Sequence, residues 1–418
     1  HPTHPFWQVP GAAIGTEYNA AKLNGEMSES SNKLRLFPLY AGAGKSQLTY
    51  AQAARWLLCV NGYDDTSAKP KEKGLPSVGA GWLGKIGFIQ AQGENLFETL
   101  MLNLTLLQDG QSMWGENLPC WERTQILCPD NPAQLLTLQS RRLLLHREND
   151  MVDRFYLLGG DFFQRETATA EQMTIWRNTA KKNEAAVFAP IRHDPAKQFW
   201  REFPSVFCKE NNVRQPGVVC WVKTLQRSDL HILAPNRRIH FRISGMQYGD
   251  KDFFVNDSFS DSLTFQAGLL DELSCEWQER IVREINNCEK AAQCVGYLAQ
   301  DIAIAAGNKN ENVGGSVRAQ FYFAVDQPFR LWLQKIDANQ KNYDEMELCW
   351  QAQARNIAEK LGEQMVMEAG NAALKGHRIE VEKTQKTENK SKTILYTSPR
   401  AYNIFRAKLW EIYPKTES

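Results

Sequence analysis

The stretch LTFQAGLLDELSCEWQERIVREINNCEKAAQCVGYLAQDI, residues 263–302, decides the fold of the C-terminal part of the chain. Its apolar residues recur at spacings of three, four and seven, which aligns them along one face of an α-helix. The pattern predicts one long helix whose apolar face packs against other helices. The residues that make up this face are Leu263, Leu270, Leu273, Trp277, Ile281, Ile285, Cys288, Ala292, Val295, Ala299 and Ile302.

Three more amphipathic segments follow this helix. They cover residues 316–336 after a Gly-Gly turn, residues 344–369, and residues 398–413 after a Ser-Pro helix start. Between the last two lies the charged stretch KGHRIEVEKTQKTENKSK, residues 375–392, which we expect to be a loop. Four amphipathic helices joined in this way predict a four-helix bundle over residues 259–418.

The first 258 residues have a mixed pattern. WLGKIGFIQAQG (82–93) and RFYLLGGDFF (154–163) have the β-branched and aromatic content of strands, whereas LFETLMLNLTLLQ (96–108) and TAEQMTIWRNTAKK (169–182) are interpreted as helices. LLTLQSRRLLLH (135–146) fits either structure, and its two arginines, Arg141 and Arg142, are the part that could reach a polyanion. The fold class is therefore α+β, with a mixed α/β body over 1–258 followed by the bundle.

Composition narrows the class of protein. The chain has 43% hydrophobic and 23% charged residues and no apolar run near the ~18 residues that cross a bilayer. We therefore expect a soluble protein without a membrane partner. Nine cysteines without a C-x-x-C pair fit reduced thiols in a prokaryotic cytoplasm. The chain starts at His1 without an initiator Met, so we expect a fragment that has lost its N-terminal part.

Charge is unevenly distributed although the net charge is only +1. Residues 33–90 hold eight Lys and Arg against three Asp and Glu, and residues 177–242 hold thirteen against five. Residues 250–301 hold four basic and eleven acidic residues. Such separation allows one part of the molecule to face a polyanion while another part meets a basic partner.

Two motifs suggest an enzyme, and neither is complete. LYAGAGKSQL (39–48) ends like a phosphate-binding loop, but Leu39 occupies the position of its first glycine. RHDP (192–195) holds a His-Asp pair, but no other histidine has a spacing that would complete a metal site, and a surface turn fits better. We therefore predict no catalytic residue, no metal and no cofactor. The alternative is an NTP-dependent or metal-dependent enzyme that uses Gly44, Lys45 and Ser46 or His193 and Asp194.

Glycine is concentrated in KGLPSVGAGWLGKIG, residues 73–87. Glycine lets a backbone approach a phosphate or a groove floor without a Cβ in the way, and the neighbouring lysines supply positive charge. The segment is therefore a candidate for contact with a nucleic-acid backbone or groove, and the alternative is a flexible surface loop.

The succession of segments along the whole chain resembles the large subunit of the type I-E CRISPR surveillance complex Cascade, the CasA family. The resemblance rests on HPFWQ, LFPLY, LTYAQAARWLL, the glycine segment running into GENLFETLMLNL, EQMTIWR, GMQYGDKD and the closing helices, in this order. It implies a non-catalytic subunit that reads the protospacer-adjacent motif (PAM) from the minor groove, opens the first base pairs and recruits a trans-acting helicase–nuclease. The implied partners are target double-stranded DNA and the guide-RNA-bearing Cascade subunits.

The resemblance also implies roles for individual residues. Phe37 and Lys45 would lie in a loop that touches DNA, and the glycine segment would lie against the PAM minor groove. A lysine near position 181 or 182 would contact the PAM. GMQYGDKDFF, residues 245–254, would form the hairpin that wedges the duplex open, although family members commonly carry glutamine at its tip. The implied DNA contacts are Phe37, Lys45, Gly79, Gly81, Gly84, Lys181 and Lys182, and the implied wedge is Asp250, Lys251 and Asp252.

Overall fold

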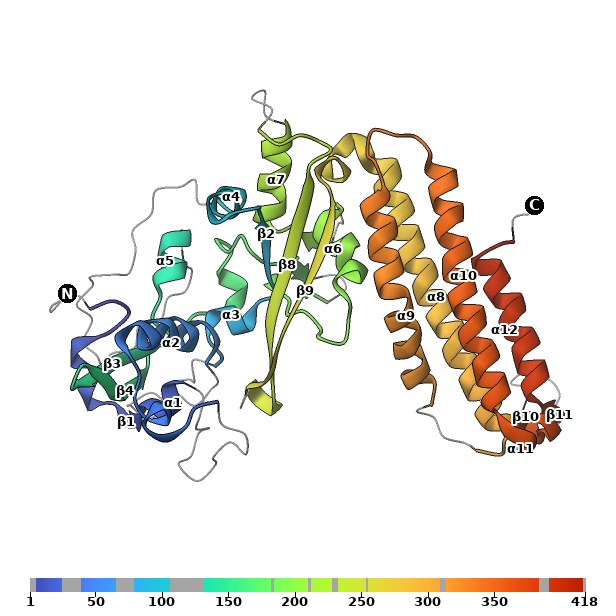
Figure 1. Ribbon diagram of the computed structural model, residues 1–418, viewed down its shortest axis with the longest axis horizontal. Coiled ribbons are helices and arrows are strands. Elements are labelled where there is room, and N and C mark those ends of the chain that lie inside the picture. Colours follow the sequence, from blue (N-terminus) through green and yellow to red (C-terminus); the bar gives the residue numbers. More distant parts are fainter. Residues whose placement is uncertain are drawn as a thin grey trace. The chain divides into compact units, whose positions relative to one another are not determined.

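The computed structural model describes residues 5–24, 39–64, 79–105, 129, 131–181, 184–209, 212–227, 232–252, 255–308, 313–382 and 391–415. The chain forms two compact units, which are coloured along the sequence in Figure 1. The first comprises His1–Phe199, Pro204–Thr224 and His240–Ser262, and the second comprises Trp200–Phe203, Leu225–Ile239 and Leu263–Ser418. Whether residues 1–258 and 259–418 behave as separate domains stays a prediction.

The first unit begins with a three-stranded antiparallel sheet of order β1-β4-β3. Its strands are β1 (Thr16–Asn19), β3 (Arg141–Glu148) and β4 (Met151–Gly159), and the last two are joined by Asn149 and Asp150, which both have positive φ. Asn and Asp tolerate this conformation in tight hairpin turns. Helices α1 (Ala20–Leu23) and α2 (Tyr50–Tyr63) supply residues to the same core. That core contains Leu23, Leu57, Leu143, Val152, Phe155 and Leu157.

A second sheet has the order β2-β8-β9 and carries a long hairpin. Strand β2 (Phe88–Gln92) pairs antiparallel with β8 (Arg238–Tyr248), and β9 is Val255–Gln266. Between β8 and β9 the chain makes a 3-10 turn at Asp250–Asp252. Buried Ile239, Phe241 and Ile243 alternate with more exposed neighbours along β8, as expected for a strand with one face on the core.

A third small sheet has the order β6-β5-β7, with β5 (Trp176–Asn178) between β6 (Phe188–Pro190) and β7 (Val213–Arg214). The predicted helix over 169–182 is therefore wrong. Thr174, Ile175 and Trp176 are consecutive and all buried, which a one-sided helix does not permit. Trp176 packs in one core with Trp82 and Ile86, on and after α3 (Trp82–Lys85), and with Leu135 of α5 (Pro132–Thr137).

The remaining helices of the first half include α4 (Leu96–Leu102), which agrees with the helix predicted from 96 onward, α6 (Phe203–Phe207) and α7 (Gly217–Arg227). Short 3-10 turns occur at Pro10–Ile14, Gly42–Lys45, Arg165–Thr167, Phe199–Glu202, Ala267–Leu270 and Glu272–Ser274. The segment 135–146, which fitted helix or strand, contains the end of α5 and the start of β3.

Four long helices dominate the second unit: α8 (Cys275–Ala305), α9 (Val313–Lys335), α10 (Tyr343–Glu368) and α12 (Ser398–Ile412). They run side by side in Figure 1, and α8 contacts each of the other three. The predicted α+β class with its C-terminal helical bundle is confirmed. Aromatic rings fill the space between the helices: the ring centroids of Phe329 and Trp350 lie 5.0 Å apart, and those of Trp332 and Trp350 lie 5.7 Å apart.

The first helix of the bundle starts later than its apolar spacing predicts. Leu263 lies in β9 and Leu270 in a 3-10 turn, while the side chain of Leu273 is 92% exposed. The part of the stripe that lies on α8 is buried as predicted, from Trp277 to Ala299. Residues of β9 and of the 3-10 turn are also buried, so apolar residues continue at similar spacings from the strand into the helix. The spacing therefore did not show where the helix begins.

The charged stretch 375–392 is not simply a loop. After the short helix α11 (Gly370–Lys375), strands β10 (His377–Glu382) and β11 (Ser391–Tyr396) pair antiparallel. The sequence HRIEVE alternates β-branched residues with charged ones, and this alternation is typical of a strand with two different faces. Within the described part of the chain, none of the helices combines the length and the apolar character that crossing a bilayer requires.

Candidate nucleic-acid interface

The glycine segment is held against the end of α2 by backbone contacts. Gly81 precedes α3, and its N–H donates a hydrogen bond of 2.9 Å to the carbonyl of Asp64. A Cβ on Gly81 would lie 2.5 Å from the carbonyl carbon and oxygen of Gly62. Gly81 is therefore required for packing within the chain. Gly79 has a φ of +70° and is half-buried, while Gly81 and Gly84 are buried.

Gly84 makes room for Tyr248, the last residue of β8. A Cβ on Gly84 would overlap the hydroxyl of Tyr248, which donates a hydrogen bond of 2.6 Å to the carbonyl of Tyr63. Burial raises the pKa of the Tyr248 phenol, so that this hydroxyl keeps its proton. The tyrosine thus ties the hairpin to the end of α2 across the glycine segment.

Arg192 joins the glycine segment to the end of the hairpin. Its Nη1 and Nη2 donate hydrogen bonds of 2.7 and 2.9 Å to the two carboxylate oxygens of Asp252, and its Nε donates one of 2.6 Å to the carbonyl of Gly84. The guanidinium also lies 5.0 Å from the centre of the Tyr248 ring. The hydrogen bonds from Arg192 lower the pKa of Asp252. Asp252 has a φ of +60°, a conformation that Asp adopts more readily than most residues.

Lys85 adds positive charge beside this pair. Burial of its ammonium, together with repulsion from Arg141, lowers the pKa of Lys85 to about 8, and attraction to Asp252 acts in the opposite direction. Burial is the main cause, and an added anion would act like Asp252, so that Lys85 would be more fully protonated next to it.

The basic pair expected to reach a polyanion is buried. Arg141 and Arg142 are only 0% and 1% exposed. Arg141 pairs with Asp64 at 3.2 Å and donates a hydrogen bond of 2.6 Å to the carbonyl of Gly79, and Arg142 pairs with Asp161 at 2.9 Å. The expectation that they reach a partner was wrong because both guanidiniums neutralise carboxylates inside the fold. Arg141 instead holds Gly79 of the glycine segment.

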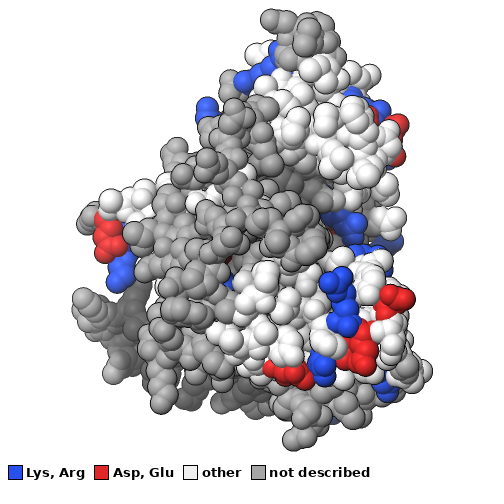
Figure 2. Space-filling view, turned by 90° about the vertical axis from the view of Figure 1, so that its left-hand side faces the viewer, with Lys and Arg blue, Asp and Glu red and all other residues white. Residues whose placement is uncertain are grey.

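Several of the separated charges neutralise each other within the chain. Arg192, Arg201 and Arg227 belong to the basic stretch 177–242 and lie within 4.0 Å of carboxylates from the acidic stretch 250–301. Their partners are Asp252, Glu289 and Asp271. On the face of the molecule in Figure 2, blue basic and red acidic side chains lie next to each other. Part of the charge separation in the sequence is therefore internal pairing.

The other expected contact residues lie at separate places. Lys45 is exposed at the end of the 3-10 turn Gly42–Lys45, and Lys181 is exposed after β5, where its backbone N–H donates a hydrogen bond of 3.2 Å to Glu184. Phe37 and Lys182 lie outside the described residues. Asp250 is exposed, and Lys251 lies with it in the hairpin turn. Contact of any of these residues with DNA stays a prediction.

The motif of the alternative enzyme hypothesis at residues 44–46 has no phosphate-loop geometry. Lys45 lies in a 3-10 turn, and α2 begins only at Tyr50, capped by Thr49, whose side chain accepts a hydrogen bond from the N–H of Gln52. A phosphate loop instead leads directly into its helix, whose first N–H groups face the phosphate.

The His193-Asp194 pair is divided between core and surface. His193 is buried beside the ring of Phe199, whereas Asp194 is exposed and accepts a hydrogen bond of 2.9 Å from the N–H of Ala196 in a turn. This agrees with the interpretation of RHDP as a turn. Neither residue belongs to the group of acidic, histidine and cysteine side chains that, within the described ranges, lie close enough together to share a metal ion.

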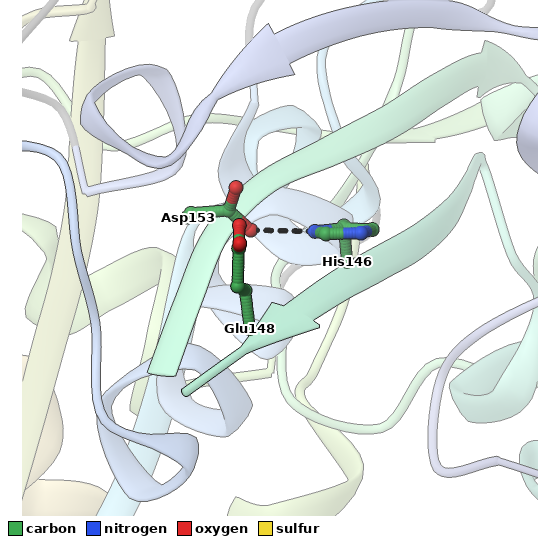
Figure 3. Close-up of side chains that lie close together, drawn as sticks. All are labelled: His146, Glu148 and Asp153. Atoms are coloured by element: carbon green, nitrogen blue, oxygen red, sulfur yellow. Dashed lines mark hydrogen bonds and ion pairs between the residues drawn. The ribbon is translucent and has the colours of Figure 1, made fainter. Parts of the chain in front are cut away.

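That cluster comprises His146, Glu148 and Asp153 on the β3–β4 hairpin (Figure 3). Nδ1 of His146 lies 2.7 Å from a carboxylate oxygen of Asp153, and Nε2 lies 3.1 Å from Nη2 of Arg154. An arginine can only donate, so Nε2 accepts and Nδ1 carries the proton donated to Asp153. With both ring nitrogens of His146 engaged and Arg154 paired with Asp153 at 3.8 Å, these side chains are held by hydrogen bonds and an ion pair within the chain. Although partial burial opposes it, the hydrogen bond from His146 lowers the pKa of Asp153.

The family model of CRISPR-associated protein Cse1 matches residues 1–361. The chain belongs to the Cse1 family. Cse1 of Thermobifida fusca has 27% identity and a TM-score of 0.79, and the match covers 100% of this chain and 80% of that one. No protein among the curated sequences matches.

Two more distant structures share the fold. Cse1 from Acidimicrobium ferrooxidans has 22% identity and a TM-score of 0.73, with 98% of this chain and 80% of that chain covered. A chain of a CRISPR RNA-guided surveillance complex has 16% identity and a TM-score of 0.62, with 98% and 78% covered. A similar structure from Thermus thermophilus carries both names, CasA and Cse1. The resemblance to the CasA family is therefore confirmed.

The sequence did not reveal the part played by Arg192. The RHDP motif suggested roles for His193 and Asp194. The residue that connects the glycine segment with the end of the β8–β9 hairpin is instead the arginine before them. Its partners, Gly84 and Asp252, are 108 and 60 residues away along the chain. No local pattern signals a contact of this kind.

Proposed function

We propose that this Cse1-family chain is a non-catalytic, DNA-interrogating subunit of a type I-E Cascade. It reads the PAM from the minor groove, opens the first base pairs with the end of the β8–β9 hairpin, and recruits the helicase–nuclease. Its partners are target double-stranded DNA and the guide-RNA-bearing subunits, and its compartment is the prokaryotic cytoplasm. The observation that supports this best is that Arg192 and Tyr248 bring the glycine segment and the hairpin end together in the free chain.

We infer that the base pairs are opened by a side chain that occupies space and is carried on a hairpin fixed to the rest of the fold. A side chain that enters the space of a stacked base step costs a few kcal/mol of unstacking, which guide pairing recovers. The end of β8 is braced by Tyr248, whose hydroxyl is bonded to the carbonyl of Tyr63, and this bond keeps the hairpin in place when its turn, which contains Lys251, meets DNA. Minor-groove reading hardly distinguishes A·T from T·A, so we expect tolerance of several PAM sequences.

A Lys251→Gly variant tests the wedge, because it removes the side chain from the turn. In a reconstituted complex with guide RNA, we expect opening of the first base pair to slow by about tenfold while duplex affinity changes by less than about threefold. Fluorescence of 2-aminopurine beside the PAM reports opening.

A duplex with mismatched first base pairs serves as the control, because it needs no wedge. The variant should then form its guide–target hybrid as fast as the parent. Equal opening rates on the fully paired duplex would exclude Lys251 as the wedge.

A further inference from the structure

We propose that Arg192 is a binding site for a DNA backbone phosphate, and that Asp252 occupies this site as an internal competitor until duplex DNA arrives. This inference rests on the proposed function and adds a residue that the family resemblance did not supply. It also gives Asp252 a role other than that of a wedge: its carboxylate stands in for the phosphate.

The geometry of the pair is the first reason. Two parallel N–H···O bonds of 2.7 and 2.9 Å join the guanidinium to both oxygens of Asp252. A phosphate presents two oxygens to arginine in the same forked arrangement, so the same donors fit either ligand. The third donor, Nε, is bound to the carbonyl of Gly84 at 2.6 Å. Arg192 can therefore stay in place while its ligand is exchanged.

The surrounding charge is the second reason. Lys85 and Arg165 both act on Asp252 as attracting cations, and Arg141 lies near enough to repel Lys85. Of these, Arg141 has Asp64 as its carboxylate partner at 3.2 Å, and Arg165 has Glu166 at 3.0 Å. If Asp252 left without replacement, the carboxylate that attracts both Arg192 and Lys85 would be lost. A phosphate in its place restores the balance.

Accessibility is the third reason. The side chains of Arg192 and Asp252 are 36% and 31% exposed, whereas those of the Arg142–Asp161 pair are 2% and 3% exposed. Because both side chains are partly exposed, a duplex can reach the pair, and the release of counterions from DNA favours exchange of the carboxylate for a phosphate. Departure of Asp252 also frees its backbone from a φ of +60°. The hairpin turn could then adjust to the duplex.

The test uses the complex reconstituted with Asp252→Asn, which keeps the shape of the side chain but removes its charge. If the carboxylate competes, affinity for a PAM-containing duplex should rise by about three- to tenfold. Asp257→Asn is the matched control, because Asp257 is exposed on the same hairpin and its Oδ1 accepts a hydrogen bond from its neighbour Ser258. A gain equal to that of Asp257→Asn would overturn the proposal.

Arg192→Lys supplies an independent measurement, because it keeps the charge and loses the fork. Adding Asp252→Asn to this background should bring no further gain beyond that of the control. Arg192→Gln should reduce the slope of log affinity against log salt by about one, as loss of one phosphate contact does. A full gain from Asp252→Asn in the Arg192→Lys background, or an unchanged slope in Arg192→Gln, would also overturn the proposal. If the parent complex binds no duplex, the proposed function fails instead.

Discussion

Glu284 shows how strongly one residue can depend on its surroundings. It lies fully buried on α8, where its Oε1 accepts hydrogen bonds from Gln351 at 2.8 Å and from Asn287 at 3.1 Å. Burial raises the pKa of Glu284 from 4.5 to about 8, although these two hydrogen bonds act against the shift, and the neighbouring carboxylate of Glu347 adds to it. Glu347 in turn is held by Arg280 and Arg283.

This raised pKa makes the stability of the bundle depend on pH. Between pH 4.5 and about 8 the folded chain keeps a proton on Glu284 that the unfolded chain has released. Stability therefore falls as pH rises through this window, and the cost is fully present above it. Glu284→Gln removes the ionisable group, so we expect a smaller fall in melting temperature from acid to alkaline buffer.

Thermal denaturation at several pH values checks this expectation. Glu279→Gln is the control, since Glu279 is exposed on the same helix. Equal pH dependence in the parent and in Glu284→Gln would show that Glu284 does not carry the effect.

At the residue scale, burial of apolar residues could be predicted from the sequence. The pairing of charged residues could be predicted less well. Trp277, Ile281, Ile285 and Cys288 are buried as their spacing indicates. Pairing could not be predicted where an arginine has its carboxylate far away in the chain. Arg141 lies 77 residues from Asp64, and only the folded chain brings them together.

Elements were predictable where one period continues without interruption. The long helices α9, α10 and α12 agree with their apolar spacing. Prediction failed where burial is two-sided or where the period changes. Residues 174–176 are buried in succession and lead into β5 instead of forming a helix, and the stripe that starts at Leu263 crosses from a strand into α8. The hairpin at 377–396 was hidden by its high charge.

A further prediction concerns Gly81, the residue before α3, which packs against the end of α2. Gly81→Ala would bring a Cβ within 2.5 Å of the backbone of Gly62, which cannot move as a side chain could. We expect a loss of about 2 kcal/mol or more in unfolding free energy, as for an overpacked core.

Chemical denaturation measures this loss. Gly44→Ala is the matched control, because the nearest atom to its new Cβ would be the Cβ of Tyr40 at 3.8 Å, so stability should change by less than about 0.5 kcal/mol. Equal stability of the two variants would show that the α2–α3 junction is not tightly packed.

At the scale of the whole molecule, the two units are not consecutive in sequence. The bundle unit includes Trp200–Phe203 and Leu225–Ile239 as well as residues from Leu263 onward. Trp200 stacks on Phe329 of α9 with ring centres 4.2 Å apart, and its Nε1 donates a hydrogen bond of 2.9 Å to Asp326. Helical periodicity predicts the helices of the bundle. It does not predict that Trp200 packs against them, because Trp200 lies outside the periodic part of the sequence.

Trp200→Ala should therefore weaken the bundle by about 3–5 kcal/mol, as truncation of a buried Trp does. Hydrogen–deuterium exchange of α9 in the 418-residue chain should report the loss. Trp221→Ala, in the first unit, is the control and should leave exchange in α9 unchanged.

The same reasoning predicts that a fragment covering 259–418 melts at a lower temperature than one covering 200–418, which contains every segment of the unit. Equal melting temperatures, with unchanged exchange in Trp200→Ala, would favour an independent domain after residue 258.

The contact between Gly84 and Tyr248 has a consequence for how such chains diverge. Arg192 is anchored on the main-chain oxygen of residue 84, which every amino acid provides, while the space above residue 84 is taken by the Tyr248 hydroxyl. Sizes at these two positions must therefore change together: an alanine at 84 would be accommodated where 248 has lost its ring, because the Cζ of Tyr248 would otherwise still lie 2.8 Å from the new Cβ. Covariation between them, with the arginine unchanged, would be the evolutionary trace of this junction.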